Sequence, residues 1–161
     1  TYPLPEAQLD RFLMQVDVTY PDLDAERRML MATTGAAEGA PVMVMTADEL
    51  LAAQRLVRRI PVGESVVEAI LGLVRAGRPE TTDIADVRDG VAWGPGPRAS
   101  QALMLTVRVK ALLEGRLSPS VDDVVELAGP TLRHRMALNF AARAEGVTLP
   151  GIIDRLCAPY R

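Results

Sequence analysis

The stretch GPGPRASQALMLTVRVK, from Gly94 to Lys110, constrains the fold more than any other part of the chain. Glycine and proline alternate over residues 94–97, so we expect a helix to begin at about Pro97 and continue to about residue 115. Its apolar side chains lie on almost every face: Leu103, Met104, Leu105, Val107, Val109, Ala111, Leu112 and Leu113. Such a helix lies centrally, with other helices packed around it.

An arginine stands where this helix begins. Arg98 falls in the first turn, which carries unpaired N–H groups and the positive end of the helix dipole. Because a cation is disfavoured there, we interpret Arg98 as aimed at an anion that is not part of this chain. The alternative is that Arg98 lies over the bundle or pairs with a surface acid.

Several other segments carry the start and stop signals of helices. Thr46 and Glu49 match a capping box, and Gly35 and Gly77 stand at two helix ends. Pro130 should break or kink the segment that Ser120 caps. The predicted helices cover residues 6–13, 21–35, 46–60 and 62–77, the segment from 121, and Leu149 to about Cys157.

Apolar periodicity predicts which faces of two helices are buried. The helix over 46–60 has one apolar stripe, and the helix over 62–77 has an inward face. These faces consist of Leu50, Ala53, Val57 and Ile60, and of Val66, Val67, Ile70, Leu71 and Val74, respectively. Residues 78–96 are rich in turn formers and predict a loop, whose length is unusual for a compact domain and indicates a function.

Residues 14–20, MQVDVTY, alternate between apolar and polar side chains and predict a short strand. A strand is not stable alone, so we expect its sheet partners to lie outside this chain. The chain begins with Thr1 rather than methionine, which we interpret as the middle of a longer protein. From residue 46 onward the pattern predicts only helices, so the fold class is mainly α.

Composition excludes several classes of function. The formal net charge is −3, which argues against nucleic-acid or anionic-membrane binding, although Arg55, Arg58 and Arg59 share one helix face. No apolar run approaches the roughly 20 residues of a membrane span. Cys157 is the single cysteine, so no internal disulfide forms, and we expect a cytoplasmic location.

The sequence also lacks the motifs of a self-contained enzyme. It contains no GxxxxGK[ST] phosphate loop, no GxSxG elbow and no Cys/His spacing typical of a metal site. The single histidine, His134, stands between Arg133 and Arg135, which makes it a poor proton shuttle. We therefore expect a structural or contact role for His134, and no catalysis by this chain alone.

Four stretches, in order, resemble one family. TYPLPEAQLDRFLMQVDVTYP resembles the segment after the sensor 1 motif of MoxR-type AAA+ ATPases, and LVRAGRP resembles their LVRATR stretch. GPGPRASQAL resembles the sensor 2 motif G-x-S-P-R-A, and DDVVELAGPTLRHRMALNFAARAEGV resembles the closing segment with its LRHR run. The resemblance covers essentially the whole chain.

The resemblance implies the C-terminal part of a ring ATPase. Residues 1–40 would be the end of the α/β core, residues 41–161 a helical lid, and residues 36–46 a hinge. ATP and Mg²⁺ would bind between core and lid of the intact protein, in a hexameric ring. Such proteins are thought to act as chaperones that remodel partners with von Willebrand factor A domains or metal centres.

The resemblance also implies roles for two arginines. Arg98 matches sensor 2, flanked by Pro97 and Ala99, and would contact the γ-phosphate of ATP in its own subunit. Arg11 matches the arginine finger and would enter the neighbouring subunit's site, where such a group raises the rate about 10³–10⁵-fold. We expect Asp10 to orient Arg11. The roles of Arg133, His134 and Arg135 stay open.

The chain departs from the family pattern at three positions. Gly96 stands where serine is usual, Gly77 replaces threonine in LVRAGR, and Val121 replaces the proline after Ser120. Of these, Gly77 removes any role of the threonine hydroxyl. The alternative to an ATPase fragment is a free-standing helical module for protein–protein interaction, with no nucleotide chemistry.

Overall fold

The computed structural model describes residues 4–35 and 41–161. Of the described residues, 4–15 together with 55–161 form one compact unit, and 16–35 together with 41–54 form a second. Part of the predicted hinge and the predicted domain boundary fall within residues 36–40, outside the described residues.

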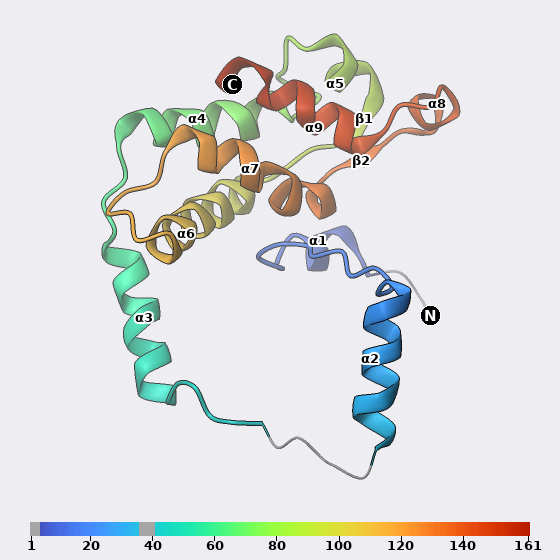
Figure 1. Cartoon of the computed structure of the whole chain (residues 1–161). Helices are drawn as coiled ribbons and strands as arrows, with labels where there is room; N and C mark the ends of the chain where they lie inside the picture. The colour runs from blue at the N-terminus through green and yellow to red at the C-terminus, as the bar shows by residue number, and fades with distance from the viewer. Residues whose placement is uncertain (1–3, 36–40) are drawn as a thin grey trace. The chain divides into compact units, whose positions relative to one another are not determined.

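The first unit is built on four helices: α4 (Glu64–Ala76), α6 (Pro97–Leu113), α7 (Val121–Leu132) and α9 (Leu149–Cys157) (Figure 1). Helix α6 packs against both α4 and α7, and α7 also packs against α9. The core between them is aliphatic; its members include Ile70, Leu73, Val74, Leu103, Val107, Val124, Leu132, Ile152 and Leu156. The predicted central helix is therefore confirmed.

The burial of α6 is less complete than its composition predicts. One side of the helix is buried, at Ala99, Leu103 and Val107 among others. On another side Leu113 is 82% exposed and Val109 is also exposed. On α4, Leu71 is exposed rather than buried as expected, and Leu73, which the pattern missed, is fully buried.

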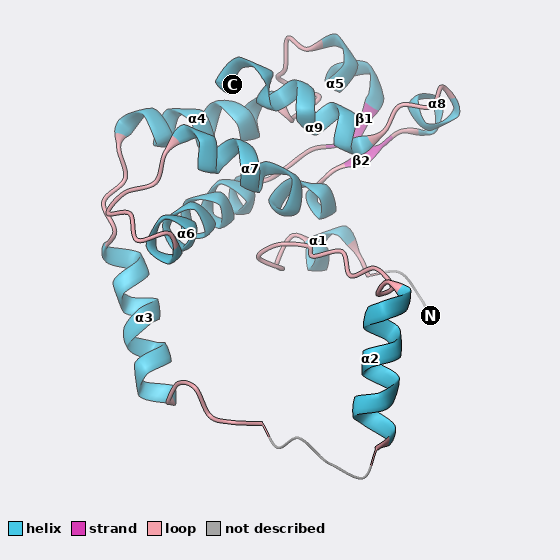
Figure 2. Cartoon of the chain, viewed as in Figure 1, coloured by secondary structure: helices cyan, strands magenta, loops and turns pink. Residues whose placement is uncertain are grey.

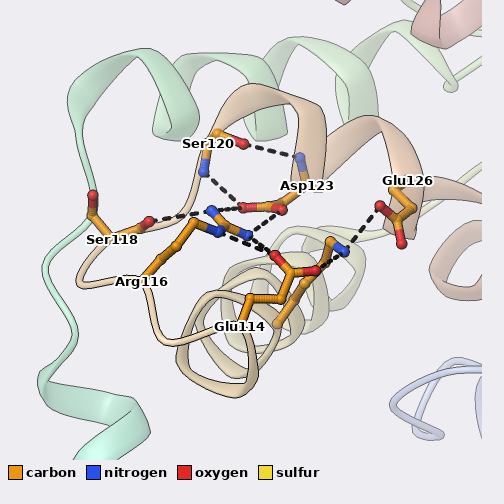
Figure 3. Close-up of polar contacts among 7 residues, drawn as sticks. Glu114, Arg116, Ser118, Ser120, Asp123 and Glu126 are labelled. Atoms are coloured by element: carbon orange, nitrogen blue, oxygen red, sulfur yellow. Dashed lines mark hydrogen bonds and ion pairs between the residues drawn. The ribbon is translucent and has the colours of Figure 1, made fainter.

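The turn between α6 and α7 is closed by charged side chains (Figure 3). Arg116 donates from Nη1 and Nη2 to the two carboxylate oxygens of Asp123, at 2.8 and 2.7 Å. Asp123 also accepts from the Ser120 backbone N–H, and its own N–H is capped by Ser120. Burial raises the pKa of Asp123, but the hydrogen bonds from Arg116 and Ser120 outweigh it, so the pKa is lowered.

Pro130 lies inside α7, which continues to Leu132, so it does not break the helix; the alternative, a kink, stays a prediction. Pro130 stands in the last turn of the helix, so the N–H that it lacks removes a single bond, to the carbonyl four residues before it. The Pro130 carbonyl accepts a hydrogen bond from the Gln15 backbone N–H at 2.8 Å.

The predicted loop over residues 78–96 is only partly a loop. It contains the helix α5 (Ala85–Gly90) and the strand β1 (Val91–Trp93). Strand β1 pairs antiparallel with β2 (Ala137–Leu138), with Val91 opposite Leu138 (Figure 2). The partner strand is distant in sequence, so local turn signals could not reveal it. The short α8 (Phe140–Ala144), capped by Asn139, was not predicted either.

The N-terminal segment departs from prediction in two ways. Helix α1 covers only Glu6–Leu9 and is followed by a turn. Residues 14–20 carry no strand, and among the described residues β1 and β2 are the strands assigned. The side chains of Val16, Val18 and Tyr20 are exposed. An extended segment becomes a strand only when a neighbour pairs with it, and none is assigned here.

The second unit contains α2 (Leu23–Thr34) and most of α3 (Ala47–Arg59). Asp22 caps α2, and Gly35 follows its end as predicted. The capping box of α3 is confirmed, because the Thr46 N–H donates to Glu49 and the Glu49 N–H donates to Thr46 Oγ1. Of the predicted stripe, Leu50 is exposed and Ile60 is buried. No helix of the described part has the length and apolar character needed to cross a bilayer.

Candidate functional site

The start of α6 is held in place by the end of α4. A Cβ added to Gly94 would lie 2.3 Å from the Gly77 carbonyl oxygen, so the two backbones meet where only glycine fits. Arg78 donates from Nε to the Pro95 carbonyl at 3.0 Å. The LVRAGRP stretch therefore packs directly against the GPGP stretch. This packing fixes where α6 begins and where Arg98 stands.

Arg98 is half exposed, with 51% of its side chain accessible, and its Nη1 lies 3.6 Å from Asp10 Oδ2. The distance corresponds to a loose ion pair rather than a hydrogen bond. An anion for Arg98 is therefore present within this chain. This pairing matches the alternative expected from sequence, in which Arg98 meets an acid.

The residues around Asp10 are fastened by a buried arginine. Arg135 is 2% exposed and stands in the short 3-10 helix η1 (Arg133–Arg135). Its Nε donates to Asp10 Oδ1 at 3.2 Å, and its Nη2 donates to the Asp10 and Phe12 carbonyls. Its Nη1 donates to the carbonyls of Leu13, at 3.2 Å, and Thr131, at 2.5 Å. All the N–H groups of the guanidinium have acceptors.

His134 contacts the same segment. Its Nε2 lies 3.1 Å from the Phe12 carbonyl, which can only accept, so Nε2 carries the proton. The other ring nitrogen, Nδ1, is buried and has no hydrogen-bond partner among the described residues. Burial lowers the pKa of His134, the Phe12 bond opposes this, and Arg135 adds to it. The expected contact role of His134 is confirmed.

Burial also acts on Arg135. It lowers the pKa of the guanidinium, and the carboxylate of Asp10 opposes this shift. Asp10 thus faces two arginines, Arg135 at 3.2 Å and Arg98 at 3.6 Å. No ion pair joins Asp10 to Arg11 among the described residues. The expectation that Asp10 orients Arg11 is therefore wrong, because the carboxylate is turned toward the two arginines of the bundle.

Arg11 and Arg98 line one cavity of about 300 Å³. Asp10 and Arg135 line the same cavity, which is completed by Leu13, Gln101, Ala102 and Leu105. Pro97 is exposed at the first position of α6, and Ala99 is fully buried in the core. Neither lines the cavity, and their predicted contacts with a nucleotide stay predictions.

The amino-acid sequence of this chain is similar to those of known proteins. Residues 85–156 match the AAA lid domain. The chain is 34% identical, over 96% of its length, to Chaperone MoxR1 of Mycobacterium tuberculosis. The chain is related to the MoxR-type AAA+ ATPases over nearly its whole length, and its helical part matches an AAA lid domain. These findings confirm the resemblance of the chain as a whole and the mainly α fold with a helical lid.

Two further proteins are similar to this MoxR-type chain. It is 34% identical, over its full length, to the uncharacterized protein YeaC of Bacillus subtilis. A crystal structure from Cytophaga hutchinsonii, named only as a candidate ATPase, superposes with a TM-score of 0.90 and 28% identity over 98% of the chain. The chain spans 41% and 48% of the two curated relatives and 48% of the solved one.

Sequence reasoning found Arg11 and Arg98 but missed what holds them. It expected a structural or contact role for His134 and assigned none to Arg133 or Arg135, whereas His134 and Arg135 both contact the segment that carries Arg11. The one available signal was the absence of acids near these basic residues in sequence. A buried arginine needs acceptors, and apart from the Thr131 carbonyl those of Arg135 come from residues 10–13.

Proposed function

We propose that this chain supplies two phosphate-contacting arginines, Arg11 and Arg98, to the ATP site of a MoxR-type ATPase. The observation that carries the proposal is the single cavity that both arginines line. A guanidinium stays charged and can bind two oxygens at once, which suits it to phosphate. Because Arg98 is half exposed and its pairing with Asp10 is loose, a phosphate oxygen can replace the carboxylate.

The donor set fits part of a nucleotide site. Two arginines that line the same cavity suit the terminal phosphates of ATP, whose charge grows during phosphoryl transfer. The chain has no GxxxxGK[ST] sequence, so the phosphate cradle and the groups that hold Mg²⁺ are assigned to other parts of the protein. ATP with Mg²⁺ supplies the cleavable phosphoanhydride, and this chain's residues bind and stabilise its charge.

The shared cavity also bears on which subunit each arginine serves. The resemblance implied that Arg98 acts on its own subunit's ATP and Arg11 on the neighbour's. Arginines that line one cavity are better suited to one and the same nucleotide. We therefore assign sensor 2 and the arginine finger of this chain to a single site.

The remaining parts of the proposal follow the family. We place residues 1–40 in the core and residues 41–161 in the lid, with a hinge near residues 36–46. The intact protein forms a ring, for which we propose six subunits, in the cytoplasm. It remodels client proteins that carry von Willebrand factor A domains or metal centres, and the chaperone named among its relatives supports this role. The interaction module without nucleotide chemistry is disfavoured by the match to ATPases.

The test is ATP turnover by the full-length protein with Arg98→Ala or Arg11→Ala. We expect Arg11→Ala to lower kcat by about 10³-fold or more, the range of an arginine finger. Arg98→Ala should also lower kcat. The melting temperature should change little in either variant, since both side chains are exposed.

Arg143→Ala is the matched control, because Arg143 is exposed on α8 and does not line the cavity. It should leave kcat unchanged. Wild-type turnover at saturating ATP in both Arg98→Ala and Arg11→Ala would overturn the proposal.

A further inference from the structure

The turn that carries Arg11 is held from both sides. Asp10, immediately before Arg11, accepts hydrogen bonds from Arg135 through its side chain and its carbonyl. Phe12 and Leu13, immediately after it, accept through their carbonyls. The side chain of Arg135 thus binds the residues on both sides of Arg11 and forms no hydrogen bond with Arg11 itself.

The same arginine is anchored to the bundle. Its Nη1 donates to the Thr131 carbonyl in α7 as well as to the Leu13 carbonyl, so one guanidinium joins the turn to the helix. Two further contacts run in parallel: His134 to the Phe12 carbonyl, and the Gln15 N–H to the Pro130 carbonyl. Residues 10–15 are therefore attached to the end of α7 at several points.

Most of these bonds end on backbone carbonyls. They fix the path of the main chain at Arg11 while leaving the Arg11 side chain to line the cavity. A buried guanidinium is costly unless every donor is satisfied, and here each one has an acceptor. Lysine could not make all these hydrogen bonds, because its three N–H donors are on a single nitrogen, whereas those of the guanidinium are spread over three nitrogens.

We infer that Arg135 is a positioning residue that holds the Arg11 turn against α7 and so aims Arg11 at its phosphate. The kinetic part of this inference rests on the proposed role of Arg11. The mechanical part, in which Arg135 fastens residues 10–13, stands on the contacts alone. Arg135 itself acts through Arg11 rather than on the nucleotide.

The kinetic test is a double-mutant cycle in the full-length protein. Arg135→Met should lower kcat by roughly 10²-fold, the effect of displacing a catalytic group by about 1 Å, with little change in KM. In an Arg11→Ala background, Arg135→Met should cause no further loss of kcat. Arg135→Lys should recover part of the kcat, and Arg143→Met should match wild type.

A spectroscopic test does not depend on turnover. A spin label on Phe12→Cys reports the mobility of the turn, in a Cys157→Ser background that keeps labelling specific. Arg135→Lys and Arg135→Met should each make this label markedly more mobile. A control label on Arg143→Cys, in α8, should be unchanged. If Arg135→Met does not fold, Arg135→Lys still provides both readouts.

The outcomes separate this inference from the proposed function. If Arg11→Ala leaves kcat unchanged, the finger role fails and the spin label alone decides whether Arg135 fastens the turn. If Arg11→Ala lowers kcat but the Arg135 variants change neither kcat nor mobility, the inference is overturned. An equal loss of kcat from Arg135→Met in the wild-type and Arg11→Ala backgrounds would also overturn it.

Discussion

At the scale of single residues, Asp10 pairs with two arginines of the site, Arg135 and Arg98. It meets the buried Arg135 at 3.2 Å and the half-exposed Arg98 at 3.6 Å. The first contact is tight and part of the fold, and the second is loose and open to replacement. Arg98 near the start of α6 therefore needs no external anion to be stable, and the proposed function requires it to exchange Asp10 for a phosphate.

His134 predicts a pH dependence of stability. Burial holds its pKa below the ordinary value of 6.5 in the folded state, so the unfolded chain takes up the proton first. Stability is full above pH 6.5 and falls as the pH drops below it toward the folded pKa. The charges facing the ring do not reverse this, because Arg135 and Asp10 act in opposite senses.

The measurement compares melting temperatures of wild type and His134→Gln between about pH 7 and pH 5. Glutamine keeps an N–H donor for the Phe12 carbonyl but does not titrate. The decline on acidification should be smaller in His134→Gln than in wild type. Identical slopes would show that His134 contributes nothing to this dependence.

At the scale of elements, the junction of α4 and α6 places Arg98. Gly94→Ala would drive a Cβ against the backbone of Gly77 and Arg78, with contacts of 2.3 and 2.9 Å. We expect a loss of roughly 1–3 kcal/mol in the free energy of unfolding, because backbone cannot yield as a side chain can. Chemical denaturation measures this change.

Gly129→Ala is the matched control for Gly94→Ala. Gly129 lies within α7, and its added Cβ meets only the end of Arg133, at an ordinary 3.9 Å. Alanine there should stabilise the helix by roughly 0.5–1 kcal/mol. The two glycine substitutions should thus have opposite signs, and a neutral Gly94→Ala would contradict the tight junction.

Elements could be predicted where their signals are local. The capping box of α3, the Ser120 cap of α7 and the bounds of α9 follow from residues three or four positions apart. The strand β1 could not be predicted, because it depends on pairing with β2. The strand expected over residues 14–20 failed for the converse reason: the alternating pattern is there, but no pairing is assigned.

At the scale of the whole molecule, the assignment of both arginines to one nucleotide predicts the behaviour of mixed rings. If Arg11 and Arg98 of one site come from one subunit, mixing Arg11→Ala with Arg98→Ala subunits leaves no complete site. If they come from different subunits, some neighbouring pairs rebuild a complete site. We expect no recovery of ATP turnover on mixing.

Two controls make the mixed-ring experiment decisive. Co-purification of an untagged variant with affinity-tagged wild type, or with the other variant, demonstrates that subunits exchange and co-assemble. Each variant mixed with itself sets the baseline. Recovery above this baseline in the Arg11→Ala with Arg98→Ala mixture would assign the two arginines to different nucleotides.

The sequence predicted only those residues of the candidate site that lie in recognisable motifs. Arg11 and Arg98 were singled out because the stretches that hold them resemble two motifs of one family. That they line one cavity could not be predicted, since they lie 87 positions apart and are joined through Asp10 and Arg135. Spacing along a chain carries no information about such a contact.

The amino-acid sequence by itself determined the helical class, most helix ends and the family, because capping, periodicity and motif order are local properties of the chain. Only the tertiary structure decided which groups the LRHR run contacts, that β1 pairs with β2, and which acid pairs with Arg98. Each of these depends on groups brought together by burial of the common core. Both a guanidinium and the edge of a strand can form hydrogen bonds with many partners, and the packing of the core decides which partner is within reach.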